Sequence, residues 1–205
     1  MSAPLFDAKQ VRRAFSRAST SYDAAAQLQH AVEARLLESL DYLDDPALKR
    51  EAPQRVLDLG CGTGRASLAM QKRWPKAQIV SLDLALPMLQ QARNAARQRV
   101  GWLSNSFAQK PTQVSADARA LPLADGSIDV LFSNLCLQWV EDLDALFAGF
   151  RRVLKPHGLL LVSTFGPETL WELREAFAHA DAAPHVSPFA DIAGFGDALV
   201  RAGFH

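Results

Sequence analysis

The chain has 205 residues, of which 49% are hydrophobic, so it is long and apolar enough for one globular domain with a substantial core. Its 22 lysines and arginines balance its 22 aspartates and glutamates, and this charge does not indicate a dedicated nucleic-acid-binding protein. The two cysteines and five histidines have no zinc-ligand spacing, and no segment resembles a signal peptide or a bilayer-spanning helix. We therefore predict a cytoplasmic protein with no metal site, and we expect neither nucleic acid nor a membrane among its partners.

Residues 7–43 are predicted to be helical, because apolar side chains recur there at spacings of three and four. The sequence SRASTSYD interrupts the pattern near Ser19–Ser21, so we expect two helices. Two aspartates and a proline at residues 44–46 end the second helix. Residues 1–45 are thus expected to form a helical unit that is attached to a domain over residues 54–205.

From residue 55 onward, short apolar runs alternate with helical segments. Strands are expected at residues 55–60, 77–83, 112–117, 128–134 and 158–165. Helices are expected at residues 65–74, 87–99, 141–154, 167–180 and 189–204. This alternation predicts an α/β fold with a doubly wound, mostly parallel sheet. The chain ends after a helix, where such a domain normally returns to the sheet, so C-terminal strands are expected to be missing.

A glycine-rich turn follows the first predicted strand, at Gly60, Gly62 and Gly64. Glycine at a strand-to-helix turn lets a ligand approach the backbone closely. Arg65 stands where the nicotinamide fingerprint GxGxxG requires its third glycine, which disfavours a nicotinamide oxidoreductase. Asp58, just before the turn, would repel a pyrophosphate but could pair with an ammonium group. The ligand predicted from these residues carries an amino group and requires no pyrophosphate.

The sequence DLGCGTG at residues 58–64 resembles the glycine motif of the class I S-adenosylmethionine-dependent methyltransferases, and the later motifs follow in order. The resemblance implies a Rossmann-like fold and S-adenosyl-L-methionine as cofactor. Asp83, at the end of the second strand, would accept hydrogen bonds from the ribose hydroxyls, although it could instead be a helix N-cap. Asp117 would accept from the adenine amino group and Ala118 would donate its backbone N–H, although Asp117 could be a plain turn residue.

The same resemblance places the sequence SNLCLQWV, after the fourth strand, beside the transferred methyl group. Met88 would stack on the adenine, but an apolar helix position is as often part of the core. Trp139 is more readily explained as core than as a substrate contact. The cofactor-binding residues implied by the resemblance are Asp58, Gly60, Cys61, Gly62, Gly64, Asp83, Leu84, Met88, Asp117, Ala118 and Asn134. His157, in the turn LKPHG before the fifth strand, stands where that family usually has glycine.

The flanking segments resemble the malonyl-acyl-carrier-protein O-methyltransferases of biotin synthesis. The resemblance rests on FDAKQVRRAFSRASTSYDAAAQLQHAVEARLLESL, on SNLCLQWVEDL and on LLLVSTFGPETLWELREAF, and that family normally continues beyond residue 205. It implies methylation of the free carboxylate of a malonyl group that an acyl carrier protein holds as a thioester. The alternatives are a methyltransferase for another small carboxylate or hydroxyl acceptor, and a cofactor-binding assembly factor that acts on a protein partner.

For this reaction, in which the resemblance implies an acidic carrier protein, three side chains and one surface are our candidates for specific roles. Tyr22 would close a helical lid, formed by residues 1–45, over the methyl group, or its ring is simply packed. Gln138 would orient the cofactor or acceptor, and Arg174 would pair with the malonyl carboxylate unless it only makes a surface ion pair. The carrier protein would be received by a basic stripe, for which an ordinary solvated helix face is the alternative. The stripe consists of Lys9, Arg12, Arg13 and Arg17.

Overall fold

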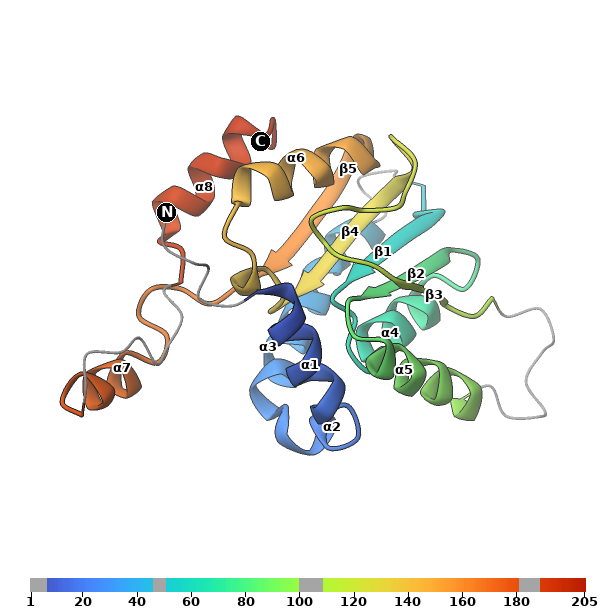
Figure 1. Ribbon diagram of the computed structural model, residues 1–205. Helices are drawn as coiled ribbons and strands as arrows, with labels where there is room; N and C mark the ends of the chain where they lie inside the picture. Colours follow the sequence, from blue (N-terminus) through green and yellow to red (C-terminus); the bar gives the residue numbers. More distant parts are fainter. Residues whose placement is uncertain (1–6, 46–50, 100–108, 181–188) are drawn as a thin grey trace.

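A sheet of five parallel strands forms the centre of the computed structural model, which describes residues 7–45, 51–99, 109–180 and 189–205 (Figure 1). The strand order is β3-β2-β1-β4-β5. The strands are β1 (Arg55–Leu59), β2 (Gln78–Asp83), β3 (Thr112–Ser115), β4 (Ile128–Asn134) and β5 (Leu154–Ser163). The predicted doubly wound parallel sheet is therefore confirmed, with the order reversing between β1 and β4.

The N-terminal helical unit is divided more finely than its sequence predicts. Its elements are α1 (Ala8–Ala18), α2 (Tyr22–Ala25), α3 (Gln27–Glu38) and the 3₁₀ helix η1 (Ser39–Asp44). The interruption at residues 19–21 was expected. A second one at Ala26, whose backbone leaves the helical region at φ −89° and ψ 36°, has no sequence signal, because alanine is the best helix former. Ala26 is only 2% exposed, so this bend is packed against the rest of the domain.

The remaining helices follow the strands in the expected alternation. They are α4 (Arg65–Arg73), α5 (Leu86–Arg99), the 3₁₀ helix η3 (Leu137–Trp139), α6 (Leu143–Val153), α7 (Trp171–Ala178) and α8 (Ile192–Arg201). None of the helices in the described part of the chain is long and apolar enough to cross a membrane. Residues 1–6 of the expected lid lie outside the described residues.

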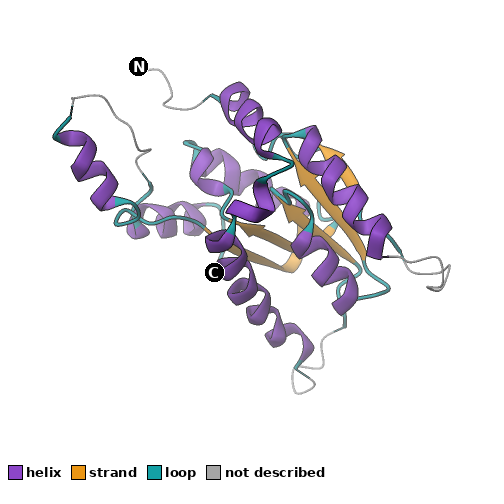
Figure 2. Ribbon diagram, turned by 90° about the horizontal axis from the view of Figure 1, so that it is seen from below, coloured by secondary structure: helices purple, strands orange, loops and turns teal. Residues whose placement is uncertain are grey.

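Helices cover both faces of the sheet (Figure 2). Adjacent residues of the strands alternate between two cores. On one face, η1 and α4 enclose a cluster that contains Val56 of β1 and Met70 of α4. On the other face, α6 and α8 enclose a cluster that contains Leu57 of β1 and Phe147 of α6. Burial on both faces explains why the strand sequences read as continuous apolar runs.

The start of β5 differs from the prediction. We expected a turn at residues 154–158 and a strand from residue 158, but pairing with β4 already begins at Leu154 and resumes at Leu159 after a register shift. His157 lies within this irregularity at φ +61°, in the left-handed region that favours glycine. The turn is thus contained in the strand as a bulge.

The lid lies against the edge of the sheet where the strands end. In Figure 1, α1 lies in front of the carboxyl ends of the central strands, and α2 lies below α1. The side-chain amide of Asn134, the last residue of β4, donates to the carbonyl of Gln29 in α3 at 3.0 Å. Thr63 of the glycine turn donates to Asp23 of α2 at 2.8 Å. These bonds hold the lid helices against the segments that form the site.

Candidate functional site

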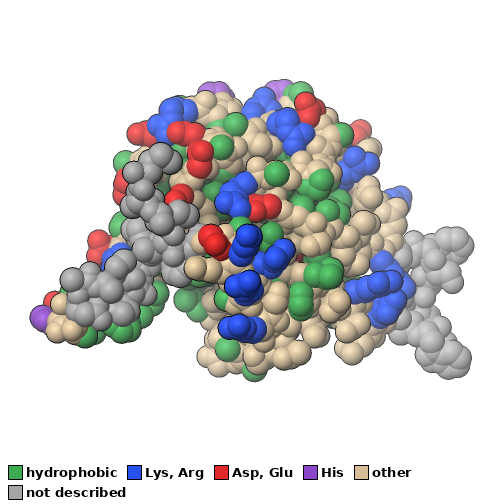
Figure 3. Space-filling view, viewed as in Figure 1, with side chains coloured by type: hydrophobic (Ala, Val, Ile, Leu, Met, Phe, Trp, Pro, Cys, Tyr) green, Lys and Arg blue, Asp and Glu red, His purple; other side chains and the backbone are tan. Residues whose placement is uncertain are grey.

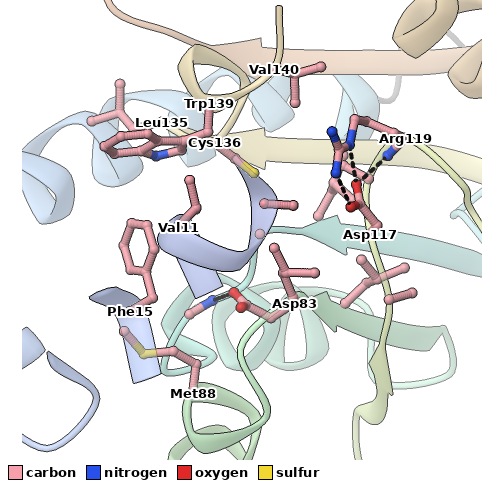
Figure 4. A pocket seen from close by; sticks show the side chains of 18 of the residues that line it. Val11, Phe15, Asp83, Met88, Asp117, Arg119, Leu135, Cys136, Trp139 and Val140 are labelled. Carbon is pink, nitrogen blue, oxygen red and sulfur yellow. Dashed lines mark hydrogen bonds and ion pairs between the residues drawn. The ribbon is translucent and has the colours of Figure 1, made fainter. Parts of the chain in front are cut away.

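A cavity opens at the carboxyl ends of the strands, beneath α1 (Figure 4). It is lined by the glycine turn, by the segments that follow β2, β3 and β4, and by the inner side of α1. In a doubly wound sheet, ligands bind at this edge, where the strand order reverses. The predicted site residues that line this cavity are Tyr22, Gly60, Gly62, Asp83, Leu84, Met88, Asp117, Ala118 and Asn134.

The three glycines of the turn all have positive φ, but they do different things. Gly62, at φ +52°, lines the cavity, and a Cβ built on it would meet nothing closer than Tyr22 Cε1 at 4.0 Å. Gly64, at φ +81°, packs instead against α5, where a Cβ would come within 2.7 Å of the Ala92 Cβ atom. Gly62 therefore provides bare backbone for a ligand, whereas Gly64 allows the close approach of α4 and α5.

Asp83 is held by backbone donors at the end of β2. One carboxylate oxygen accepts from Gly62 N at 2.9 Å, and the other accepts from Ala85 N at 2.8 Å, just before α5 begins. Burial raises the pKa of Asp83, although these backbone hydrogen bonds oppose the rise. The bond to Ala85, two residues along the chain, is an Asx-type turn that precedes α5, so Asp83 is not the helix N-cap that we considered as an alternative. Each oxygen keeps a second lone pair for hydroxyl donors on the cavity side.

Asp117 is bound more completely than the sequence suggested. Arg119 makes a two-pronged contact with its carboxylate, with Nε at 2.9 Å and Nη2 at 2.6 Å. This guanidinium lowers the pKa of Asp117. Arg119 also lines the cavity, and it is the one cationic side chain among the described lining residues. The prediction that Asp117 accepts from the adenine did not include Arg119 as its partner. The position of Arg119, two residues after Asp117, could have indicated this contact from the sequence.

Aromatic rings from the lid cover the cavity. Phe15 of α1 lies 6.2 Å from the Tyr22 ring and 5.8 Å, edge to face, from the Trp139 ring. All three line the cavity, so Trp139 contacts the site as well as packing. Burial raises the pKa of Tyr22, and the nearby Asp83 carboxylate adds to this. The hydroxyl of Tyr22 is therefore a neutral hydrogen-bond donor at neutral pH.

A smaller polar hollow adjoins the cavity on the other side of the glycine turn. Asp58 and Cys61 line this hollow and not the main cavity. The Asp58 carboxylate accepts from Ser67 Oγ at 2.5 Å, and its burial raises its pKa to about 7. Glu33 of α3 lies across the hollow, with Arg65 Nε 3.5 Å from its carboxylate. No sequence pattern had indicated Glu33.

The methyltransferase domain family model matches residues 57–162, which span the glycine turn and β1 through most of β5. The chain belongs to this methyltransferase domain family.

Related proteins and solved structures agree with this assignment. The chain is 60% identical over 200 residues to the malonyl-(acyl-carrier protein) O-methyltransferase of Xylella fastidiosa, covering 98% of this chain and 63% of that protein. It is 48% identical over 198 residues to the protein of the same name from Laribacter hongkongensis, covering 97% of this chain and 64% of that protein. The chain thus spans less than two thirds of the length of either relative.

Solved structures show the same fold. The crystal structure of the (4+2)-cyclase SpnF is 19% identical with a TM-score of 0.72, covering 99% of this chain and 75% of that one. The Haemonchus contortus phosphoethanolamine N-methyltransferase 2 in complex with S-adenosyl-L-methionine is 22% identical with a TM-score of 0.62. The match covers 83% of this chain and 36% of that one. At these identities the likeness concerns the fold alone.

Besides Asp58 and Cys61, which line the adjoining hollow, three predicted site residues of this methyltransferase lie outside the main cavity. Gly64 packs against α5, as described above. Gln138 Nε2 donates to the backbone carbonyl of Leu135 at 2.6 Å, so its amide supports the segment after β4 instead of facing the cavity. Arg174 donates to the carbonyl of Pro167, and α7 projects away from the sheet in Figure 1. The structure thus does not bring Gln138 or Arg174 to the ligand position that we expected.

Proposed function

We propose that this methyltransferase uses S-adenosyl-L-methionine to esterify the free carboxylate of malonyl-acyl-carrier protein, as a step in biotin synthesis. The observation that carries this proposal is the similarity, over nearly the whole chain, to two proteins named for that reaction. A protein named as a biotin biosynthesis bifunctional protein, from Saccharophagus degradans, is 38% identical over 201 residues and supports the same pathway.

The two adjoining hollows suit the two ends of the cofactor. The adenosine would occupy the main cavity, with Asp83 accepting from the ribose hydroxyls and the segment at Asp117 and Ala118 facing the adenine edge. The amino-acid end would reach the polar hollow, where Asp58 and Glu33 offer carboxylates to its ammonium group. Gly62, which borders both hollows, would let the cofactor pass close to the backbone.

The chemistry requires alignment more than acid–base catalysis. A carboxylate oxygen attacks the methyl carbon, an O–C bond forms, and the C–S bond breaks with its electron pair going to sulfur. The acceptor is already an anion at neutral pH, so no proton must be removed. The aromatic cover of Phe15, Tyr22 and Trp139 would exclude water and hold the reacting atoms in line.

The acceptor carboxylate needs a cation. Arg119 lines the cavity, but its guanidinium is already held in a two-pronged contact by the Asp117 carboxylate. We therefore keep Arg174 as the proposed partner, whose contact with the acceptor requires it to leave the Pro167 carbonyl.

Transfer of a labelled methyl group tests the proposal. The protein, extended to the length of its relatives if activity requires it, is incubated with methyl-labelled S-adenosylmethionine and either malonyl-carrier protein or a small malonyl thioester. We expect labelled methyl ester on both. Cofactor binding without transfer to either substrate would favour the assembly-factor alternative, and transfer to another small acid but not to malonyl would favour a different acceptor.

A further inference from the structure

Helix α1 has two faces of opposite character. Val11 and Phe15 line the cavity from its inner face. At 100° per residue, the basic stripe falls on the opposite face, and all four of its side chains are exposed. Figure 3 shows lysine and arginine side chains gathered over α1 on the surface of the molecule. The stripe consists of Lys9, Arg12, Arg13 and Arg17.

The basic stripe has no ion-pair partner among the residues that the structure describes. In residues 7–45, 51–99, 109–180 and 189–205, none of its four side chains forms an ion pair. Other exposed arginines are paired, as Arg152 is with Asp125 and Arg201 is with Asp144. The stripe is thus a local excess of positive charge in a chain whose lysines and arginines equal its aspartates and glutamates.

The arrangement of the stripe works against the stability of the helix. Lys9 and Arg13, and Arg13 and Arg17, are four residues apart, and like charges at this spacing cost about 0.2–0.5 kcal/mol per pair. The helix carries no acidic residue in its first turn to offset them. Folding alone does not explain this concentration of charge, whereas an external anionic surface does.

A third hollow lies at the N-terminal end of α1, next to the stripe. It is lined by Lys9 of the stripe together with Asp7, Glu141 and Asp142, among others. It shares Ala8, Arg119 and Trp139 with the main cavity. A group that enters beside Lys9 is therefore adjacent to the covered site, which suits a substrate carried on a flexible arm.

We propose that the outer face of α1 is the docking surface for an acidic carrier protein, whose acyl arm enters the site through the hollow beside Lys9. This inference rests on the proposed function, because it concerns the carrier of that substrate. Docking on α1 also places the partner directly on the helix that carries Val11 and Phe15, so binding the carrier stabilises the cover over the cavity.

The test compares two double charge reversals of equal size. The first is Arg12→Glu with Arg13→Glu in the stripe. The matched control is Lys72→Glu with Lys76→Glu, which are also exposed but lie at the end of α4 and after it. Because α4 runs back from the carboxyl edge of the sheet, these control positions are at the opposite edge from the site. Each protein is assayed with malonyl-carrier protein and with a small malonyl thioester.

We expect the stripe variant to lose about tenfold or more in kcat/KM for the carrier-bound substrate, chiefly through KM, while turnover of the small thioester stays unchanged. The control should match the wild type with both substrates. Raising the ionic strength should weaken the wild type in the same selective way, and this measurement needs no variant. The deciding quantity is the ratio of kcat/KM for the carrier-bound substrate to kcat/KM for the small thioester. The docking proposal would be overturned if the stripe variant kept the wild-type ratio, or if salt did not change this ratio in the wild type. Failure of the wild type with both substrates would refute the proposed function instead.

Discussion

Two alanine substitutions in the glycine turn should separate a folding role from a binding role. In Gly64→Ala, the new Cβ would lie 2.7 Å from the Ala92 Cβ and 3.2 Å from its Cα, with the backbone at φ +81°. A left-handed alanine costs about 1–2 kcal/mol and overpacking about 1–3 kcal/mol, which together make about 2–5 kcal/mol. A domain of this kind has only about 5–15 kcal/mol of stability, so the loss should be large.

Gly62→Ala is the matched comparison. Its backbone, at φ +52°, is also left-handed, but its nearest neighbour, Tyr22 Cε1, would be 4.0 Å away. We expect a loss of only about 1–2 kcal/mol in the free energy of unfolding. Because Gly62 lines the cavity, its added methyl group should nevertheless weaken cofactor binding strongly, and the larger Gly62→Val should abolish it.

Urea unfolding and titration calorimetry measure the two effects. The steric part of the Gly64→Ala loss is isolated by adding Ala92→Gly, which removes the clashing Cβ at a helix cost of about 1 kcal/mol. The double-mutant cycle should show a favourable coupling of about 1–3 kcal/mol. Equal stability losses in Gly64→Ala and Gly62→Ala, or the absence of coupling to Ala92, would refute the assignment of Gly64 to helix packing.

Substitutions at three further residues address the site. Asp83→Ala should weaken S-adenosylmethionine binding by about 1.5–3 kcal/mol, the range for hydrogen bonds to a charged group; unchanged affinity in a calorimetric titration would remove the ribose assignment. Burial raises the pKa of Asp58 from 3.8 to about 7, so the folded state keeps a proton that the unfolded state has lost, and stability should fall as pH rises between these values. Urea unfolding at about pH 5 and about pH 8 should show a smaller decrease in Asp58→Asn than in the wild type, and an identical decrease would mean that Asp58 is not the group responsible. Arg174→Ala should lose methyl transfer while cofactor binding persists, and Arg174→Lys should recover only part, because an ammonium cannot make a two-pronged contact; full turnover in Arg174→Ala would place the carboxylate elsewhere.

Local patterns were sufficient for the elements of the fold and for much of the site. The alternation of strands and helices predicts a parallel sheet, in which all strands end at one edge. The glycine turn after β1 and the acids at the ends of β2 and β3 are therefore predicted to lie together. Gly62, Asp83 and Asp117 do line one cavity. The break after α1 could be read as well, because a run of serine and threonine there interrupts the apolar spacing.

Predictions that depended on the placement of one element against another were less successful. Arg174 has a position in the sequence that suits an acceptor contact, but the direction of α7 decides where its guanidinium goes, and no local pattern encodes that direction. Gln138 was expected at the ligand, but it supports Leu135 because the segment after β4 turns back on itself. The bend at Ala26 lies at a buried residue, and the high helix propensity of alanine does not predict it.

The sequence by itself determined the order of the elements, the parallel sheet, the glycine turn and the acids at the strand ends, because each follows from residue periodicity or from the backbone freedom of glycine. Only the tertiary structure decided how those parts combine. It placed Phe15 against Trp139, bound Asp117 to Arg119, and assigned Asp58 to a separate hollow with Glu33. The physical reason is that side-chain contacts between elements depend on their relative positions and on the burial of the whole domain, which local spacing does not specify.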